Sequence, residues 1–356
     1  MKALVLCAGK GTRLRPLTFT SAKHLIPVAN KPILMYSLEA IKNAGIEEVG
    51  LVVSPDNAED FKKRFGDGSE IGLKISYIVQ HEPKGLAHAV AVSRDFLGDD
   101  DFLMYLGDNL ISVDLKEFVD EFNSGGYDAY VLLTPVDDPT RFGVVVLKDG
   151  KIVEIVEKPK VPPSNLAIIG VYLFTSKIFE GVDNIKPSWR GEYEITDAIG
   201  YLVKKGYNVS AKVIYGWWKD TGKPEDLIEA NRKLLEEMSV TSIRGNVDHS
   251  SVIQGRVQIG EDTSVIDSVI RGPVIIGRGT RIRNAYIGPY TSIGNNVVLE
   301  DCEIENSIVL DETSIIRVPN RIDSSVFGRN VFLTTSDAKP RILRFILGDY
   351  SRTELI

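Results

Sequence analysis

The 356-residue sequence predicts an α/β domain, built on a mixed and mostly parallel sheet, followed by a parallel β-helix. Three observations lead to this prediction. Apolar, strand-like runs alternate with helical patterns as far as about residue 235, helical periodicity stops near Met238, and short aliphatic–glycine repeats follow. A chain of this length is expected to form two domains, which we place at residues 1–238 and 239–356.

Six apolar runs in the first domain are typical of buried strands. They are Ala3–Cys7, Val49–Val53, Ile75–Val79, Phe102–Leu106, Ala129–Val136 and Leu166–Phe174. Helical patterns separate many of them: one begins near Pro32 and stops at Gly45, and others are GLAHAVAVSRDFL and PEDLIEANRKLLEEM. This alternation predicts helices on both faces of the sheet and a ligand site outside the carboxyl ends of its strands.

The second domain is marked by repeats such as VQIGED, VIIGRG and AYIGPY, which run from Val247 to about Ser314. Gly260, Gly277, Gly288 and Gly294 follow one another at 17, 11 and 6 residues, close to multiples of six. Such hexapeptide repeats predict a β-helix, whereas a sandwich of short strands gives no reason for this period. The apolar tail PRILRFILGDY is strand-like, and it is expected to close the last coil or to pack on a neighbouring subunit.

Composition excludes several classes of protein. The net charge of -7 argues against nucleic acid as the main partner, and no apolar run is long enough to span a bilayer. The opening MKALVL is too short for a signal peptide, so we expect a cytoplasmic location. The two cysteines, Cys7 and Cys302, are far apart in unrelated surroundings, which makes a disulfide framework or a zinc site improbable.

The amino terminus is basic in an acidic chain. Residues 1–38 contain no Asp or Glu but carry Lys2, Lys10, Arg13, Arg15, Lys23 and Lys31. A solvated surface is one interpretation, and a pocket for a strongly anionic small molecule is the other. The strand–glycine loop favours the pocket, because backbone N–H groups approach phosphate closely where side chains are absent. The loop matches neither the dinucleotide fingerprint nor the P-loop.

The loop instead contains the pattern G-x-G-T-R, followed by P-x-T and a lysine, from Gly9 to Lys23. This pattern resembles the signature of the sugar-1-phosphate nucleotidylyltransferases. Further segments resemble that family in order: YIVQHEPKGLAHA, YLGDN, VEIVEKPK with GVYLF, GEYEITDAI and WWKDTGK. They span the first domain, and with the repeats and the ending FILGDY the whole chain is similar to the family's long thymidylyltransferase branch.

The resemblance implies a Rossmann-like nucleotidyltransferase domain, a left-handed β-helix, and transfer of a nucleotidyl group from dTTP to glucose 1-phosphate. It implies that Arg13 and Lys23 hold the departing pyrophosphate end of the nucleotide. The nucleotide-binding residues that it implies are Leu6, Ala8, Gly9, Gly11, Thr12, Arg13, Gln80 and Gly85. Gln80 and Gly85 are expected to read the base, because an amide both donates and accepts hydrogen bonds.

The resemblance also implies a magnesium site and a sugar-phosphate site. Asp108 and Asp220 each follow a strand and are the expected Mg²⁺ ligands, since this ion takes a few carboxylates plus phosphate oxygens. The catalytic set is then Arg13, Lys23, Asp108, Lys158 and Asp220. Gly143, Glu157, Lys158, Tyr172 and Trp218 are expected to bind the sugar phosphate, although core packing is an equal alternative for Tyr172 and Trp218.

Several functional alternatives remain open. UTP-dependent transfer to glucose or N-acetylglucosamine 1-phosphate is one, and an inactive regulatory or assembly protein of the same architecture is another. Arg13, Lys23, Asp108 and Asp220 are all retained, which disfavours the inactive form. His249 is the only histidine after residue 88, so acetyl transfer by the β-helix is not expected. The β-helix is expected to serve structure, with the chain forming a homo-oligomer.

Overall fold

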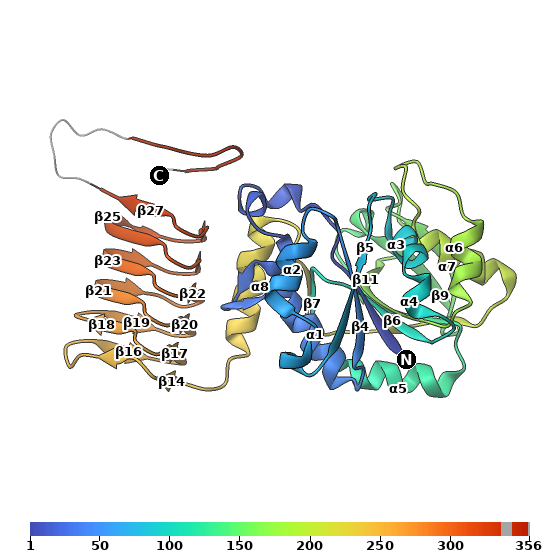
Figure 1. Cartoon of the computed structure of the whole chain (residues 1–356), viewed down its shortest axis with the longest axis horizontal. Coiled ribbons are helices and arrows are strands. Elements are labelled where there is room, and N and C mark those ends of the chain that lie inside the picture. Colours follow the sequence, from blue (N-terminus) through green and yellow to red (C-terminus); the bar gives the residue numbers. More distant parts are fainter. Residues whose placement is uncertain (336–343, 355–356) are drawn as a thin grey trace. The chain divides into compact units, whose positions relative to one another are not determined.

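The computed structural model describes residues 1–335 and 344–354, whose contacts separate into two compact units (Figure 1). The first unit comprises Met1–Lys10, Ser21–Leu25 and Ile33–Asp220, and the second comprises Gly11–Thr20, Ile26–Pro32 and Thr221–Ile356. The sequence predicts a boundary after residue 238, whereas helix α8 (Pro224–Glu236) belongs to the second unit. Among the described residues, no helix combines the length and the apolar character that crossing a bilayer requires.

The first unit is built on a nine-stranded sheet in the order β5-β4-β1-β6-β11-β8-β12-β10-β9. Its strands are β1 (Lys2–Leu6), β4 (Glu48–Val53), β5 (Lys74–Val79), β6 (Phe102–Leu106), β8 (Ala129–Pro135), β9 (Gly143–Lys148), β10 (Lys151–Glu157), β11 (Leu166–Phe174) and β12 (Val209–Val213). Strands β5, β4, β1 and β6 pair in parallel, as do β8 and β12. Strand β11 runs antiparallel between β6 and β8, and β9 and β10 form an antiparallel hairpin. The predicted α/β fold with a mixed sheet is confirmed.

Helices cover both faces of this sheet (Figure 1). Alternate residues of a strand point to opposite sides, so a single strand contributes side chains to two cores. Ala3 and Val5 of β1 belong to a core that includes residues of α1 (Ile33–Asn43), α2 (Ala58–Phe65) and α5 (Leu115–Gly125). Leu4 and Leu6 belong to the opposite core. That core includes residues of α3 (Leu86–Val92), α4 (Arg94–Leu97), α6 (Ile178–Asn184) and α7 (Ile195–Lys205).

One predicted helix is divided in two. The segment GLAHAVAVSRDFL forms α3 and α4, which meet at Ser93. The Ser93 hydroxyl donates to the carbonyl oxygen of Ala89 at 2.7 Å, and its backbone leaves the helical range at φ -95° and ψ 3°. Serine competes for backbone carbonyls in this way and so favours an interruption of the helix.

The carboxyl ends of the parallel strands bring distant segments to one edge of the sheet. Gly9 follows β1, Gln80 follows β5 and Asp108 follows β6. A small antiparallel ribbon of β7 (Asn109–Ile111) and β13 (Trp218–Asp220) continues from β6 and pairs Asp220 with Asn109. This edge is where the sequence predicts the ligand site.

The second unit is dominated by short parallel strands stacked in successive coils (Figure 1). They are β14 (Ser242–Ile243), β15 (Asn246–Val247), β16 (Val252–Gln254), β17 (Val257–Ile259), β18 (Ser264–Ile266), β19 (Val269–Arg271), β20 (Val274–Ile276), β21 (Arg281–Ile287), β22 (Thr291–Ile293), β23 (Val298–Ile304), β24 (Ile308–Val309), β25 (Ser314–Ile322), β26 (Val326–Phe327) and β27 (Phe332–Thr334). Val257 pairs with Val274 and Val274 pairs with Thr291, so each of these coils advances by 17 residues. A domain of β-helix type is confirmed, and its left-handedness stays a prediction.

The coils extend beyond the predicted repeats, and other segments join them. The strands begin at Ser242 and continue to Thr334, outside the predicted range of 247–314. The short hairpin of β2 (Pro27–Val28) and β3 (Lys31–Pro32) is held by Asn231 of α8, whose Oδ1 accepts from the Ala29 N–H at 2.9 Å. The strand predicted for residues 340–350 lies partly outside the described residues, and Arg344–Tyr350 form no strand.

Candidate active site

The glycine loop begins where β1 ends. Leu6 is buried at the end of the strand, and Ala8 and Gly9 follow it towards the surface. A Cβ atom placed on Gly9 would lie 3.2 Å from Cε of Lys23. Gly9, whose backbone is predicted to bind phosphate, and Lys23 are therefore neighbours in the first unit.

Gly11, Thr12 and Arg13 fall in the segment that the contacts assign to the second unit. Gly11 has φ 61° and precedes the short 3-10 helix η1 (Thr12–Leu14). The Thr18 hydroxyl donates to the Gly11 carbonyl oxygen at 2.8 Å and so closes this turn. Arg13 is exposed on η1, which leaves its guanidinium accessible to an anion.

Lys23 and Asp108 form an ion pair at the edge of the sheet, with side chains only 15% and 14% exposed. Burial alone would lower the pKa of Lys23, but the negative charges of Asp108 and Asp220 outweigh it and raise that pKa. Burial likewise opposes ionisation of Asp108, yet the Lys23 ammonium holds the pKa of this carboxyl below its usual range. Both groups are therefore charged, and one cation faces two carboxylates.

Asn109 and Trp218 support this centre. The Asn109 amide donates from Nδ2 to Oδ1 of Asp108 at 2.9 Å, and its Oδ1 accepts from Trp218 Nε1 at 2.6 Å. Trp218 also meets Phe142 edge-on at 5.1 Å between ring centroids. Our sequence reasoning missed Asn109, although it lies in the YLGDN motif beside Asp108. The sequence predicts that Trp218 binds the sugar phosphate. In the structure its indole N–H donates to Asn109, which in turn donates to Asp108.

Cys7 and His24 lie beneath the centre and are poor nucleophiles. Burial raises the pKa of the Cys7 thiol, which keeps it protonated. Burial and the charge of Lys23 lower the pKa of His24 to about 3, and the residue is only 1% exposed, which keeps the ring out of contact with a substrate. These surroundings disfavour a covalent intermediate on either side chain.

The predicted base-reading residues lie together after β5. Gln80 is 6% exposed, and its Nε2 donates to the Gly85 carbonyl oxygen at 3.3 Å. Gly85 has φ 104°, and a Cβ atom there would lie 2.5 Å from the Tyr193 carbonyl oxygen. The Tyr193 N–H in turn donates to the Lys84 carbonyl oxygen at 2.7 Å. This segment therefore requires glycine at position 85 and is held by the loop that precedes α7.

Replacing Gly85 with alanine is expected to lower the melting temperature and to raise KM for the nucleotide. The Cβ atom adds a backbone clash to the strain of a positive φ, together of order 1–3 kcal/mol. Gly98→Ala is the matched control, since Gly98 has φ 59° and open space around its Cβ position. Thermal unfolding and nucleotide titration measure both effects. Equal behaviour of the two variants would contradict the role of the Tyr193 contact.

A second charged cluster surrounds Glu157 at the end of the β9–β10 hairpin. Lys158 Nζ and Arg190 Nη1 each lie 3.7 Å from Glu157 Oε1, and the Thr196 hydroxyl donates to Oε2 at 3.0 Å. Burial, together with the charge of Glu194, raises the pKa of Glu157. Arg190 also pairs with Glu192 at 2.9 Å and with Glu194 at 3.1 Å, so the cluster combines cations and carboxylates. Such a combination suits a ligand that carries both a phosphate and hydroxyl groups.

The predicted sugar-phosphate residues Gly143 and Tyr172 line or underlie this cluster. Gly143 pairs with Glu157 across the hairpin, and a Cβ there would lie 2.7 Å from Thr196 Cγ2 and 3.2 Å from Glu157 Oε2. Tyr172 is 4% exposed and stacks on Phe174, so the structure places it in the core beneath Glu157. Our sequence reasoning missed Arg190 and Thr196, although both lie in or beside the GEYEITDAI motif.

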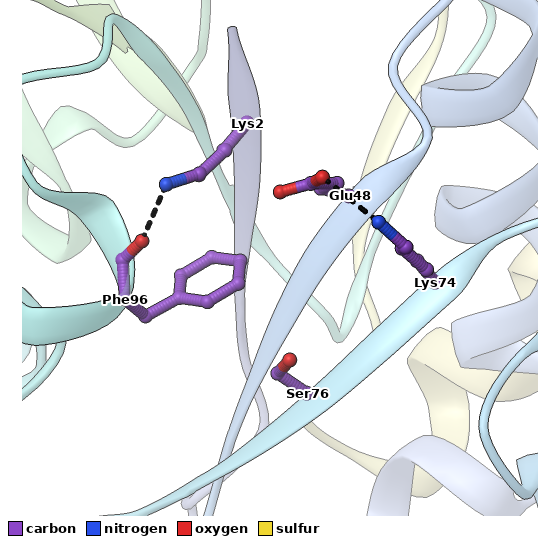
Figure 2. Close-up of a pocket in the computed structure, with 5 residues that line it drawn as sticks. All are labelled: Lys2, Glu48, Lys74, Ser76 and Phe96. Carbon is purple, nitrogen blue, oxygen red and sulfur yellow. Dashed lines mark hydrogen bonds and ion pairs between the residues drawn. The ribbon is translucent and has the colours of Figure 1, made fainter.

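A shallow hollow of about 280 Å³ lies elsewhere, at the amino ends of β1, β4 and β5. Figure 2 shows its lining of Lys2, Glu48, Lys74, Ser76 and Phe96. Lys2 Nζ donates to the Phe96 carbonyl oxygen at 2.7 Å, and Lys74 pairs with Glu48 at 3.2 Å. The hollow therefore lies at the edge of the sheet opposite to Gly9, Gln80 and Asp108, and its lysines have protein partners.

The carboxylate centre has the donor chemistry that Mg²⁺ requires. Asp108 and Asp220 offer hard oxygen ligands, and the Lys23 ammonium already occupies the position of a cation beside Asp108. Within residues 1–335 and 344–354, no group of three or more His, Cys, Asp or Glu could hold a metal by protein ligands alone.

A glycine loop after β1, a carboxylate centre after β6 and a charged cluster around Glu157 agree with an enzyme that transfers nucleotidyl groups. Residues 2–237 match the family model for nucleotidyl transferase, and the chain belongs to that family.

Within the family, the chain is 51% identical to a glucose-1-phosphate thymidylyltransferase of Streptomyces griseus over 356 residues, which cover all of this chain and 99% of the relative. It is 42% identical to a UTP–glucose-1-phosphate uridylyltransferase of Haloferax volcanii over 67% of this chain and 98% of that protein.

A solved structure agrees with these sequence comparisons. The crystal structure of a Bacillus anthracis protein, described as a glucose-1-phosphate thymidylyltransferase in complex with sucrose, superposes with a TM-score of 0.63. It is 38% identical and covers 68% of this chain and 98% of its own. The Streptomyces relative, in contrast, matches along the whole chain, including the coiled strands.

Proposed function

We propose that the protein transfers a thymidylyl group from dTTP to glucose 1-phosphate, giving dTDP-glucose and pyrophosphate. The observation that carries this choice of substrates is the 51% identity to the Streptomyces thymidylyltransferase across the whole chain. The paired charges of Lys23, Asp108 and Asp220 support nucleotidyl transfer as the reaction at this site.

In the proposed reaction, an oxygen of the sugar phosphate forms a bond to the α-phosphorus of dTTP. The bond from the α-phosphorus to the bridging oxygen breaks in line, and pyrophosphate leaves with those electrons. The nucleophile needs no general base, because the second pKa of a phosphate is about 6. The burial of His24, which keeps its ring out of contact with a substrate, agrees with direct transfer.

The remaining difficulty is electrostatic, and the charged side chains address it. Arg13 and Lys23 would hold the pyrophosphate end, while Lys158 and Arg190 would hold the incoming sugar phosphate beside Glu157. Asp108 and Asp220 would hold Mg²⁺. When bound, this ion neutralises phosphate charge and aligns the two substrates.

Uridylyl transfer is the second candidate, favoured by the similarity to the Haloferax uridylyltransferase. Thymine and uracil differ by one methyl group, which is worth about 1 kcal/mol of apolar contact, or roughly fivefold in rate. We therefore expect dTTP to be the best substrate with UTP within about tenfold. A cytoplasmic location and a homo-oligomeric state also stay predictions.

Pyrophosphate release across dTTP, UTP, CTP, ATP and GTP, each with a panel of sugar 1-phosphates, tests the proposal. The highest kcat/KM is expected for dTTP with glucose 1-phosphate. A clear preference for UTP, or for N-acetylglucosamine 1-phosphate, would select the second candidate. Absence of turnover with every pair would instead favour the inactive regulatory form.

A further inference from the structure

We propose that His88, together with the Gly85 carbonyl oxygen, fixes the orientation of the Gln80 amide, so that the base site accepts pyrimidines with an N3–H donor and rejects cytosine. His88 is then a positioning residue that determines base selectivity through Gln80. This inference rests on the proposed function, in which Gln80 reads the base.

The geometry starts from two contacts of one nitrogen. Gln80 Nε2 lies 3.3 Å from the Gly85 carbonyl oxygen and 2.9 Å from His88 Nδ1. Gln80 is 6% exposed, directly after β5, and His88 lies in the first turn of α3, immediately beyond Gly85. The three groups therefore form a compact set in which the buried amide has its partners within the protein.

The Gly85 carbonyl oxygen shows which way the amide is turned, because a carbonyl oxygen can only accept, and His88 at 2.9 Å makes the shorter of the two contacts that hold the amide there. Turning the amide over would set Gln80 Oε1 against the Gly85 oxygen, two acceptors with no proton between them. The NH₂ group must therefore face Gly85, and its second hydrogen points to His88. It follows that His88 Nδ1 is the acceptor and that the ring carries its proton on Nε2.

The surroundings of His88 agree with a neutral ring. Burial lowers the pKa of His88, and the nearby Lys84 lowers it further, against a smaller opposite effect of Glu82. A protonated ring would donate from Nδ1 and would attract Gln80 Oε1 instead. The neutral tautomer thus completes the chain of hydrogen bonds that begins at the Gly85 carbonyl.

With both amide hydrogens engaged, only Gln80 Oε1 is left for the base. Thymine and uracil present a donor at N3, which this oxygen can accept, whereas cytosine presents an acceptor at N3. An amide that is free to turn could donate to cytosine instead. Removing the acceptor at position 88 leaves only the longer contact to Gly85 to hold the amide, so discrimination against cytosine should relax and dTTP binding should weaken.

Steady-state kinetics of His88→Leu, with dTTP and dCTP as alternative substrates, test the proposal. We expect KM for dTTP to rise more than kcat falls, KM for glucose 1-phosphate to change little, and the ratio of kcat/KM for dTTP over dCTP to fall about tenfold. His88→Asn should restore much of the ratio, because Oδ1 can accept in place of Nδ1. His81→Leu, at an exposed histidine, is the matched control.

A comparison of Gln80→Leu with His88→Leu separates this inference from the proposed function. If Gln80→Leu leaves kcat/KM for dTTP intact, the base site itself is wrong. If Gln80→Leu impairs dTTP use while His88→Leu keeps the dTTP-to-dCTP ratio, only the role of His88 is overturned.

Nitrogen-15 NMR of the free protein, which has only four histidines, should show His88 protonated on Nε2. A proton on Nδ1 would contradict the assignment.

Discussion

Replacing Asp108 or Asp220 with asparagine is expected to lower kcat on the order of 10²–10³-fold, measured with both the sugar phosphate and the nucleotide at saturation. Each change removes one of the two carboxylates that face Lys23 and that are proposed to hold Mg²⁺. Removing one group that stabilises charge during phosphoryl transfer has effects of this size. Initial rates across a magnesium titration measure the loss.

Asp100→Asn is the matched control, because Asp100 precedes the same strand, β6, at its opposite end and pairs with Lys2. It should retain the activity of the unmodified protein. The Asp108 variant leaves the buried Lys23 without its partner, so its melting temperature is expected to fall. Because Asp220→Asn leaves the ion pair between Lys23 and Asp108 in place, its rate tests the metal assignment without that loss of stability. Near-normal rates for a folded Asp220 variant would contradict the metal assignment.

Replacing Lys23 with methionine is expected to lower kcat/KM for dTTP on the order of 10²-fold or more. Methionine keeps the length of the side chain but removes the charge next to Gly9, where the pyrophosphate end is proposed to bind. The reverse reaction should show a higher KM for pyrophosphate, while KM for glucose 1-phosphate changes less. Rates in both directions give this comparison.

Lys74→Met provides the matched control for Lys23. Lys74 lies in the same sheet, at the amino end of β5, and pairs with Glu48 in the hollow of Figure 2. We expect Lys74→Met to leave the rates of both the forward and the reverse reaction unchanged. Equal losses for the Lys23 and Lys74 variants would mean that general charge, rather than the position beside Gly9, governs nucleotide binding.

The strands of the first unit were predictable because they are buried on both faces. Phe102–Leu106 and Leu166–Phe174 coincide with β6 and β11, since continuous apolar runs leave little choice of boundary. The β9–β10 hairpin was not separated into strands, because Lys151 and Glu154 are exposed and interrupt its apolar pattern. Helix α5 was missed although Asp114 caps it, with its carboxylate accepting from the Lys116 N–H.

The second unit was predicted in type but not in extent. The central coils carry the aliphatic–glycine period, which made them recognisable, whereas the terminal strands β14 and β27 depart from it. No local signal predicts that the hairpin of residues 26–32 packs with α8. That association depends on Asn231, whose amide also donates to the Tyr290 carbonyl oxygen at 2.9 Å.

The candidate site was predictable where a residue follows a strand directly. Gly9, Gln80 and Asp108 follow β1, β5 and β6, and parallel strands end at one edge of a sheet. Arg190, Thr196 and His88 reach the site through loops and helix starts, whose positions follow from tertiary packing. Arg190 contacts Glu157 from 33 residues further along the chain, a distance over which sequence pattern gives no register.

The most direct test of the central claim is a crystal structure with dTTP and Mg²⁺ in the absence of sugar phosphate. We expect the triphosphate to lie against the backbone of Gly9 and the Lys23 ammonium, with the base at Gln80 and Gly85. Binding of dTTP at the hollow of Lys2 and Lys74 instead, or anywhere remote from Lys23, would contradict the account.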